Sequence, residues 1–333
     1  MDARFSRQVR LPQIGEAGQR ALGRARVLVA GCGALGSHTA VALLRAGVRR
    51  LALVDRDLVE VSNLHRVALF TPRDVGHPKA DRLAHHLRKV DPGAQVEAHV
   101  THLSPRNAEQ LATGVDLVVD GLDNLESRYL VNDVCVKHHL PWVYTAVLAT
   151  YGMTMPIVPG AGPCLRCLFP QPPPPGALPT CATAGILGPL PMAMAALQSA
   201  SALQLLLASR ELRPGQLVHV DLWARKFAEV EVARAVNCPA CRGGQFDSLA
   251  SPPRSAAMCG DAVQIIPASP GQVNLDALAR RLAPLGRVRR RGEVVVAELS
   301  EVSLTVFSDG RALVKGITDL QRAQALYDQY VAR

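Results

Sequence analysis

The chain has 333 residues, of which 48% are hydrophobic and 20% are charged, and this composition describes an ordinary folded protein with a sizeable core. The first residues lack the apolar stretch of a secretory signal, and no run is long and apolar enough to cross a bilayer, so we expect a cytoplasmic protein without a membrane partner. The eight cysteines are then not expected to form a disulfide framework. The formal net charge of +9 is compatible with an acidic partner or with arginines scattered over a solvated surface.

The first half of the chain predicts strands that alternate with helices. A short helical arm is expected over about residues 1–20. After it, apolar β-branched runs alternate with segments of helical periodicity, and Pro78 stands just before one of the helices as a start signal. The expected strands are 26–31, 50–57, 95–103 and 116–124, and the expected helices are 35–47, 79–90 and 128–139. This order is typical of a mostly parallel, doubly wound sheet.

The second half predicts an antiparallel extension of that sheet. Residues 141–159 are expected to form two antiparallel strands, and a long apolar helix over 193–209 precedes a strand pair over 217–232. Between these elements, the proline run within 167–181 excludes regular structure.

The domain organisation expected from these patterns is an α/β, Rossmann-like domain over 1–245, a linker over 246–257 and a small α+β unit over 258–333. In the last unit, Asp309-Gly310 lies between apolar runs as a hairpin turn. Thr318 is expected to cap the final helix.

A glycine-rich turn follows the first expected strand, with Gly31, Gly33 and Gly36 in a G-x-G-x-x-G pattern before a helix. The glycines permit a tight turn and let phosphate oxygens approach backbone N–H groups at the helix N-terminus. Asp55 ends the next strand, where a carboxylate can accept hydrogen bonds from ribose hydroxyls. On these residues alone, a nicotinamide cofactor is the leading interpretation, with turn packing alone as the structural alternative.

Several polar side chains beside this loop favour a triphosphate over a dinucleotide. Asn63, Arg66 and Lys79 follow the acidic strand end closely, and cations can neutralise the charge that develops as pyrophosphate leaves. The strand over 116–124 places Asp120 and Asp123 at the carboxyl end of the sheet, where an aspartate can hold Mg²⁺ against phosphates. Each cation alone fits a surface salt bridge, but the cluster favours ATP.

Two cysteine pairs have the spacing of metal ligands. Cys164-x-x-Cys167 and Cys238-x-x-Cys241 supply four thiolates, which suit a closed, tetrahedral, structural Zn²⁺ site. Two unrelated buried pairs and a redox-active dithiol are the alternatives.

The other cysteines differ in their setting. Cys181 lies between a proline-rich segment and a helix-like run, where a thiol can be accessible and reactive, so a covalent role and a bland role both remain open. Cys32, Cys135 and Cys259 are interpreted as ordinary small residues.

Taken together, these motifs resemble the bacterial MoeB/ThiF family of adenylyltransferases, relatives of the eukaryotic ubiquitin-activating enzymes. The resemblance runs over about residues 1 to 245 and is carried, in order, by RFSRQVRLPQIG, GCGALGS, LVDRDLVEVSNLHR, VGHPKA, DGLDN, the two cysteine pairs and CATAGILGP. It implies ATP-dependent adenylation of the C-terminal glycine of a ubiquitin-like sulfur carrier with a Gly-Gly ending, with release of pyrophosphate. A sulfurtransferase or cysteine desulfurase is then a possible sulfur donor.

The resemblance also implies roles for individual residues. Arg7 would reach the triphosphate of the other subunit, so an active homodimer is implied, and Asp123 would hold Mg²⁺. Cys181 matches the crossover cysteine of relatives, which bonds covalently to the carrier in some of them and is dispensable in others. Nucleotide contacts are implied for Gly31, Gly33, Gly36, Asp55, Asp57, Asn63, Arg66 and Lys79.

Three other functions fit these residues less well. An NAD-dependent oxidoreductase would need an acid/base histidine near a substrate pocket, and His85, His86, His138 and His139 all fall on expected helices. A non-catalytic binding module conflicts with the intact set of charged residues. Nucleic-acid binding is not expected, because basic residues do not interleave with aromatic ones. The C-terminal unit lacks the cysteine-centred loop of a rhodanese, and the resemblance assigns it no function; its basic RVRRRG run can contact an acidic carrier or be solvated.

Overall fold

The computed structural model describes residues 2–172, 181–250, 256–257, 262–267 and 271–332. Its contacts divide the chain into two compact units. The first comprises Met1–Val75 and Lys79–Ser251, and the second comprises Gly76–Pro78 and Pro252–Arg333.

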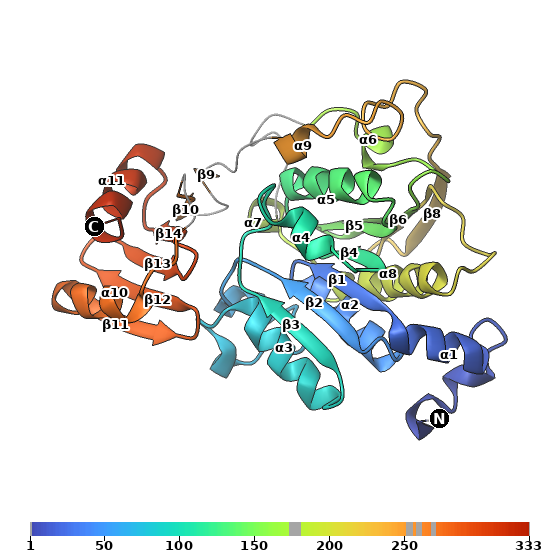
Figure 1. The fold of residues 1–333 in the computed structure, drawn as a ribbon, viewed down its shortest axis with the longest axis horizontal. Helices are drawn as coiled ribbons and strands as arrows, with labels where there is room; N and C mark the ends of the chain where they lie inside the picture. The colour runs from blue at the N-terminus through green and yellow to red at the C-terminus, as the bar shows by residue number, and fades with distance from the viewer. Residues whose placement is uncertain (1, 173–180, 251–255, 258–261, 268–270, 333) are drawn as a thin grey trace. The chain divides into compact units, whose positions relative to one another are not determined.

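The first unit is built on an eight-stranded sheet with the order β3-β2-β1-β4-β5-β6-β7-β8 (Figure 1). The pairs from β3 to β5 are parallel, and the pairs from β5 to β8 are antiparallel. The expected mostly parallel sheet with an antiparallel extension is therefore confirmed. The strands are β1 (Arg26–Ala30), β2 (Arg50–Val54), β3 (Gln95–His99), β4 (Leu117–Asp120), β5 (Trp142–Leu148), β6 (Tyr151–Ile157), β7 (Gln216–Asp221) and β8 (Lys226–Glu231).

Helices cover both faces of this sheet, so its central strands are apolar on both sides. Along β1, Val27 and Val29 enter one core cluster, and Leu28 and Ala30 enter another, because successive strand residues point to opposite faces. The first cluster packs against α1, α2, α3 and α8, and the second against α4 and α5. The helices are α1 (Gly15–Arg24), α2 (Ala34–Arg45), α3 (Lys79–Val90), α4 (Ala108–Ala112), α5 (Leu125–Lys137), α6 (Leu165–Leu168), α7 (Cys181–Ala184), α8 (Leu190–Leu206) and α9 (Asp247–Ala250).

Three details differ from the expected elements. The N-terminal arm is not one helix, because two 3-10 turns, Ala3–Phe5 and Gln8–Arg10, precede α1. Pro12 lies between the second turn and α1, and a proline there prevents one continuous helix. The helix α4 was not expected, and α9 lies within the expected linker. Part of the proline-rich segment, residues 173–180, lies outside the described residues.

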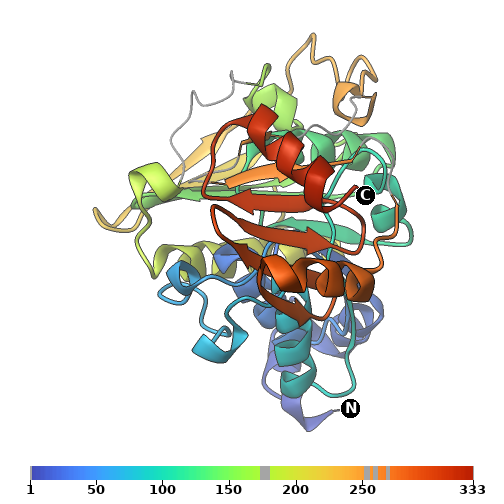
Figure 2. The same ribbon diagram turned by 90° about the vertical axis from the view of Figure 1, so that its left-hand side faces the viewer.

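The second unit has its own antiparallel sheet, with the order β11-β12-β13-β14-β10-β9. Figure 2 shows α10 and α11 on the same side of this sheet, and side chains from both helices share one core with the strands. The expected α+β class is confirmed, and the Asp309-Gly310 turn joins β13 to β14 as a hairpin. The elements are β9 (Ala256–Ala257), β10 (Ala262–Ile265), α10 (Leu275–Leu282), β11 (Gly286–Arg291), β12 (Val294–Leu299), β13 (Ser303–Phe307), β14 (Ala312–Lys315) and α11 (Leu320–Tyr330).

The cap expected at Thr318 is wrong by one residue. Asp319 is the N-cap of α11, and its carboxylate accepts a hydrogen bond from the backbone N–H of Arg322. An aspartate and a threonine are both good caps, so the sequence alone did not separate the two adjacent positions.

Candidate active site

The carboxyl ends of β1, β2 and β4 lie side by side at one edge of the first sheet (Figure 1). Ala30 is in register with Val54 on one neighbour and with Asp120 on the other. The pairing continues one residue beyond the strands, since Gly31 N–H donates to the Val54 carbonyl at 2.8 Å and Gly121 N–H donates to the Ala30 carbonyl at 2.7 Å. In open α/β sheets this edge is where ligands bind.

The three glycines of the loop after β1 have different tasks. Gly31 has a φ of +93°, a conformation that favours glycine. A Cβ on Gly36 would overlap the Gly31 carbonyl oxygen, so this glycine lets α2 pack against the loop. Gly33, the N-cap of α2, has ordinary φ and faces open space. The first N–H groups of α2 therefore border an open space where a phosphate can bind.

Asp55 holds the glycine loop against β2. One carboxylate oxygen accepts from Cys32 N–H at 2.7 Å, and the other accepts from Asp57 N–H at 2.7 Å. Burial raises the pKa of Asp55, and the nearby Lys79 charge opposes that rise. Burial also raises the pKa of the Cys32 thiol well above its ordinary value, as expected for a thiol that acts only as a small buried residue.

Lys79 begins α3 and lies against Asp57. Its Nζ is 2.9 Å from Asp57 Oδ2, and its backbone N–H donates to the Asp57 carbonyl at 2.9 Å. Burial alone would lower the pKa of Lys79, but the charges of Asp57, Asp55 and Asp123 outweigh it and raise the pKa. The structure thus brings Lys79 and three acidic side chains of the expected site within electrostatic range of one another.

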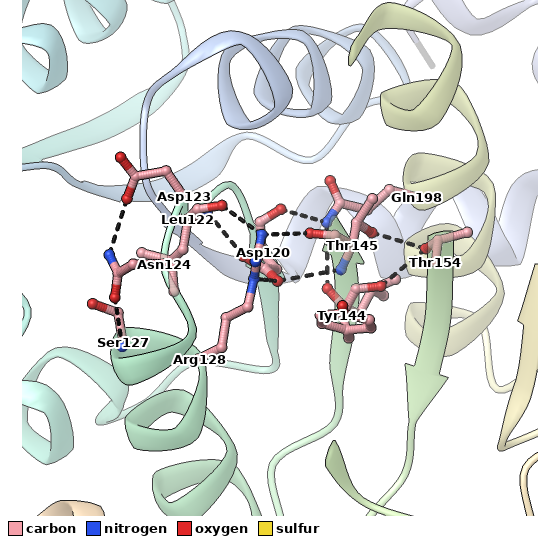
Figure 3. A network of polar contacts seen from close by, with 11 residues as sticks. Asp120, Leu122, Asp123, Asn124, Ser127, Arg128, Tyr144, Thr145, Thr154 and Gln198 are labelled. Atoms are coloured by element: carbon pink, nitrogen blue, oxygen red, sulfur yellow. Dashed lines mark hydrogen bonds and ion pairs between the residues drawn. The ribbon is translucent and has the colours of Figure 1, made fainter. Parts of the chain in front are cut away.

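Asp123 lies in the loop between β4 and α5 and is exposed. Its carboxylate accepts from Asn124 Nδ2 at 2.9 Å, and Asn124 Oδ1 in turn caps α5 by accepting from Ser127 N–H at 2.8 Å (Figure 3). An exposed carboxylate at this edge is a suitable ligand for Mg²⁺. Asp120, its expected neighbour, is fully buried and serves the interior of the protein instead.

Asn63 and Arg66 lie in the connection between β2 and α3. Asn63 is buried and accepts from Glu60 N–H at 3.1 Å, so it shapes its own turn. Arg66 is half-buried and donates to the Ser62 carbonyl at 2.7 Å.

Arg7 is exposed on the N-terminal arm and is not brought to the glycine loop of its own chain. The adjacent Gln8 donates to the Ala46 carbonyl at 2.7 Å, and Ala46 is the C-cap of α2. The glycine loop lies at the opposite end of that 12-residue helix, and a helix of this length spans about 18 Å.

The two cysteine pairs converge in space. The Sγ atoms of Cys164 and Cys238 are 3.5 Å apart, those of Cys167 and Cys241 are 3.6 Å apart, and all four lie within 4.8 Å of one another. Four sulfurs at 2.3 Å from a tetrahedral Zn²⁺ would be separated by about 3.8 Å, so this donor set fits the ion. The hydrogen bond between the two thiols lowers the pKa of Cys167 and raises the pKa of Cys164, so this pair loses its first proton from Cys167.

Two cysteines outside this cluster, Cys135 and Cys181, lie in helices. Cys181 begins α7, and Cys135 is buried in the core. Cys259 lies outside the described residues. In the part of the chain that the structure describes, no helix is long and apolar enough to cross a membrane.

Sequence reasoning missed a buried polar network behind the Asp123 loop, centred on Arg128, Asp120 and Gln198 (Figure 3). The available signal was the occurrence of Arg128 and Asn132 four residues apart among the apolar residues of one helical run, which also holds Asp133. Such a pair on one helix face indicates polar groups that need buried partners.

Comparison with known proteins identifies the family. The model of the ThiF family matches residues 5–240 of this chain. The chain is 37% identical over 339 residues to the sulfur carrier protein ThiS adenylyltransferase of Bacillus subtilis, covering 99% of this chain and 100% of that relative. It is 44% identical over 243 residues to the sulfur carrier protein adenylyltransferase of Thermus thermophilus, covering 72% of this chain and 90% of the relative.

A solved structure shares the fold over much of this chain. The crystal structure of E. coli MccB with ATP aligns with a TM-score of 0.63 at 22% identity, over 72% of this chain and 75% of that chain. With a family match over 5–240 and a relative aligned along almost its entire length, the chain belongs to the ThiF family.

Proposed function

We propose that this protein uses ATP to adenylate the C-terminal carboxylate of a ubiquitin-like sulfur-carrier protein and releases pyrophosphate. The observation that carries this proposal is the sheet edge where an open glycine loop, the Lys79 ammonium and the exposed Asp123 carboxylate meet. This combination suits a metal-bound triphosphate better than a dinucleotide. The names of the relatives in Bacillus subtilis and Thermus thermophilus support the same activity, and the NAD-dependent alternative is not retained.

In the proposed site, the phosphates and the ribose of ATP would bind at different points along this edge of the sheet. Backbone N–H groups at the start of α2 would bind phosphate oxygens beside Gly33, and Asp55 would contact the ribose. Asn63, Arg66 and Lys79 would contact the phosphates. Gly31 and Gly36 would shape the loop, and Asp57 would hold the Lys79 ammonium in place. Asp123 would hold Mg²⁺, which supplies charge neutralisation on the phosphates when bound.

The proposed chemical step needs no side-chain nucleophile. A carboxylate oxygen of the carrier attacks the α-phosphorus, an acyl–phosphate bond forms, and the bond from the α-phosphorus to the bridging oxygen breaks as pyrophosphate leaves. The protein accelerates this step by aligning two anions and neutralising their charge with Lys79 and Arg66.

A homodimer forms part of the proposal because of the position of Arg7. This residue lies beside the far end of α2, about 18 Å from the glycine loop by the length of that helix, and an arginine side chain cannot span that distance. Arg7 would therefore act on the nucleotide of a second subunit.

The remaining parts of the proposal concern the rest of the chain. The four converging cysteines would hold a structural Zn²⁺, and Cys181 would be available for a covalent bond to the carrier. Residues 1–245 would form the adenylation domain, 246–257 the linker and 258–333 an appendage. A sulfurtransferase or cysteine desulfurase would supply sulfur to the adenylated carrier.

The test is ATP–pyrophosphate exchange with the full chain and a panel of purified carriers that end in Gly-Gly. Exchange that depends on one carrier and disappears in Asp123→Ala is expected. A matched control is Asp116→Ala, which lies at the opposite end of β4 and is expected to retain exchange. The absence of exchange with every carrier, together with tight NAD binding, would overturn the proposal.

A further inference from the structure

Arg128 lies one turn into α5, directly behind the loop that carries Asp123. Its side chain is only 9% exposed, and Nε donates to Asp120 Oδ2 at 2.8 Å. Asp120 ends β4 and is completely buried. The guanidinium also lies over the Tyr144 ring at 5.5 Å. A buried ion pair of this kind contributes little net stability compared with apolar packing, so its value lies in the geometry that it fixes.

That geometry concerns the residue directly before Asp123. Arg128 Nη2 donates to the Leu122 carbonyl at 2.6 Å and to the Thr145 carbonyl on β5 at 3.1 Å. The N–H of Leu122 donates to Asp120 Oδ1 at 2.9 Å. Both backbone groups of Leu122 are therefore bound by the two halves of one ion pair, as Figure 3 shows. The rigid, planar fork of a guanidinium is suited to this task.

A second contact ties the same network to the glycine-loop helix. Gln198 on α8 donates to the Asp120 carbonyl at 2.8 Å, and its Oε1 accepts from Thr39 Oγ1 at 2.5 Å. Thr39 lies on α2, the helix that begins after Gly33. The elements that carry the two phosphate-handling groups, Gly33 and Asp123, are thus linked through buried hydrogen bonds.

We propose that Arg128, with Gln198, is a positioning residue: it holds the Leu122 backbone so that the Asp123 carboxylate is fixed relative to the glycine loop, and it thereby sets the affinity of the ATP site for Mg²⁺. This inference rests on the proposed function of Asp123 and the glycine loop. It assigns Arg128 no contact with ATP or with the carrier.

The test uses Arg128→Lys in the full chain. A lysine ammonium can keep the ion pair with Asp120 but cannot also bind the Leu122 and Thr145 carbonyls in the fixed directions of the guanidinium. ATP binding is measured by calorimetry without Mg²⁺ and over a series of Mg²⁺ concentrations. We expect metal-free ATP affinity within about twofold of wild type and a Mg²⁺ half-saturation raised about 10- to 100-fold, as is usual when a partner of a metal ligand is lost.

Two further variants separate positioning from general stability. Leu87→Ala opens a cavity in the other core cluster, and it is expected to lower the melting temperature without moving the Mg²⁺ half-saturation. Gln198→Met removes the bond to the Asp120 carbonyl without touching the ion pair. It is expected to raise the Mg²⁺ half-saturation in the same direction as Arg128→Lys, and it serves as the test if that variant does not fold.

The outcomes distinguish this inference from the proposed function. A wild-type chain that binds no ATP overturns the proposed function itself. Wild-type binding with an unshifted Mg²⁺ half-saturation in the folded Arg128→Lys or Gln198→Met chain overturns only the positioning role. An equal loss of metal-free and metal-bound ATP affinity also overturns it, because such a loss indicates a collapsed cleft.

Discussion

The Lys79 ammonium lies 2.9 Å from the Asp57 carboxylate, and the backbone N–H of Lys79 donates to the Asp57 carbonyl at the same distance. The start of α3 is thereby fixed to the loop after β2 by two bonds between the same residues. The Asp57 and Asp55 charges raise the pKa of Lys79 in spite of its burial, so the side chain stays charged at every physiological pH. A fixed cation is thus available at the sheet edge before any nucleotide binds.

This arrangement predicts that Lys79→Ala will lower kcat/KM for ATP–pyrophosphate exchange by about 10²- to 10³-fold, the cost of losing one fixed charge at a reacting group. Lys89→Ala provides the matched control, because Lys89 is exposed near the other end of the same helix. The control is expected to keep wild-type exchange. If Lys79→Ala also kept it, the assignment of Lys79 to the phosphates would be wrong.

The two glycines Gly33 and Gly36 predict opposite phenotypes for the same substitution. Gly33→Ala places a methyl group in open space at an ordinary φ, so the chain should fold with an unchanged melting temperature. The methyl group would occupy space expected for a phosphate, and ATP affinity should fall by at least about tenfold. Gly36→Ala instead forces a methyl group against the Gly31 carbonyl and should cost about 1–3 kcal/mol or more of stability. Melting curves and ATP calorimetry on both variants check this, and unaltered ATP binding by Gly33→Ala would contradict it.

Much of the fold was predictable because its signals are local in the sequence. A strand, three spaced glycines and a helix lie within about twenty residues. The C-x-x-C spacing of the cysteine pairs likewise predicts a tetrahedral metal site without further information. Alternation of apolar strands with helices was enough to predict a parallel sheet, and parallel order alone brings the ends of β1, β2 and β4 to one edge.

The part that escaped prediction depends on contacts between distant segments. Arg128 binds the Thr145 carbonyl, and Gln198 binds the Asp120 carbonyl, 78 residues away. No local pattern specifies such partners, since a polar residue in an apolar helix shows only that some partner is needed. The role of Arg7 stays a prediction, because its expected target lies on a second subunit.

The cysteine cluster predicts a metal-dependent fold. Wild-type protein should contain about one Zn²⁺ per chain, and Cys238→Ser should lose it, because a closed structural site needs all four thiolates. Its melting temperature should fall by about 5 °C or more. Cys135→Ala is the control, since this thiol is buried in the same core cluster but is not part of the four. Elemental analysis and melting curves measure both effects, and a full zinc content in Cys238→Ser would refute the site.

Asp74 predicts a pH-dependent contribution to stability. Its side chain is 1% exposed, and it accepts from Thr71 N–H at 2.8 Å, from Arg82 Nε at 2.5 Å and from His86 Nε2 at 3.0 Å. Burial opposes ionisation, but these hydrogen bonds outweigh it and lower the pKa of Asp74 below its ordinary 3.8. A carboxylate whose pKa is lowered by folding stabilises the protein above the unfolded-state pKa and loses that contribution as the pH falls through the folded-state value.

Asp74→Asn should therefore lower the free energy of unfolding by about 1–3 kcal/mol at pH 7, and the difference from wild type should shrink progressively as the pH falls below about 4. Urea unfolding followed by tryptophan fluorescence reports on the first unit alone, because Trp142 and Trp223, the two tryptophans of the chain, both lie in it. Glu16→Gln, an exposed acid on α1, should match wild type at each pH. A difference at pH 3 as large as that at pH 7 would mean that the Asp74 charge is not what stabilises this turn.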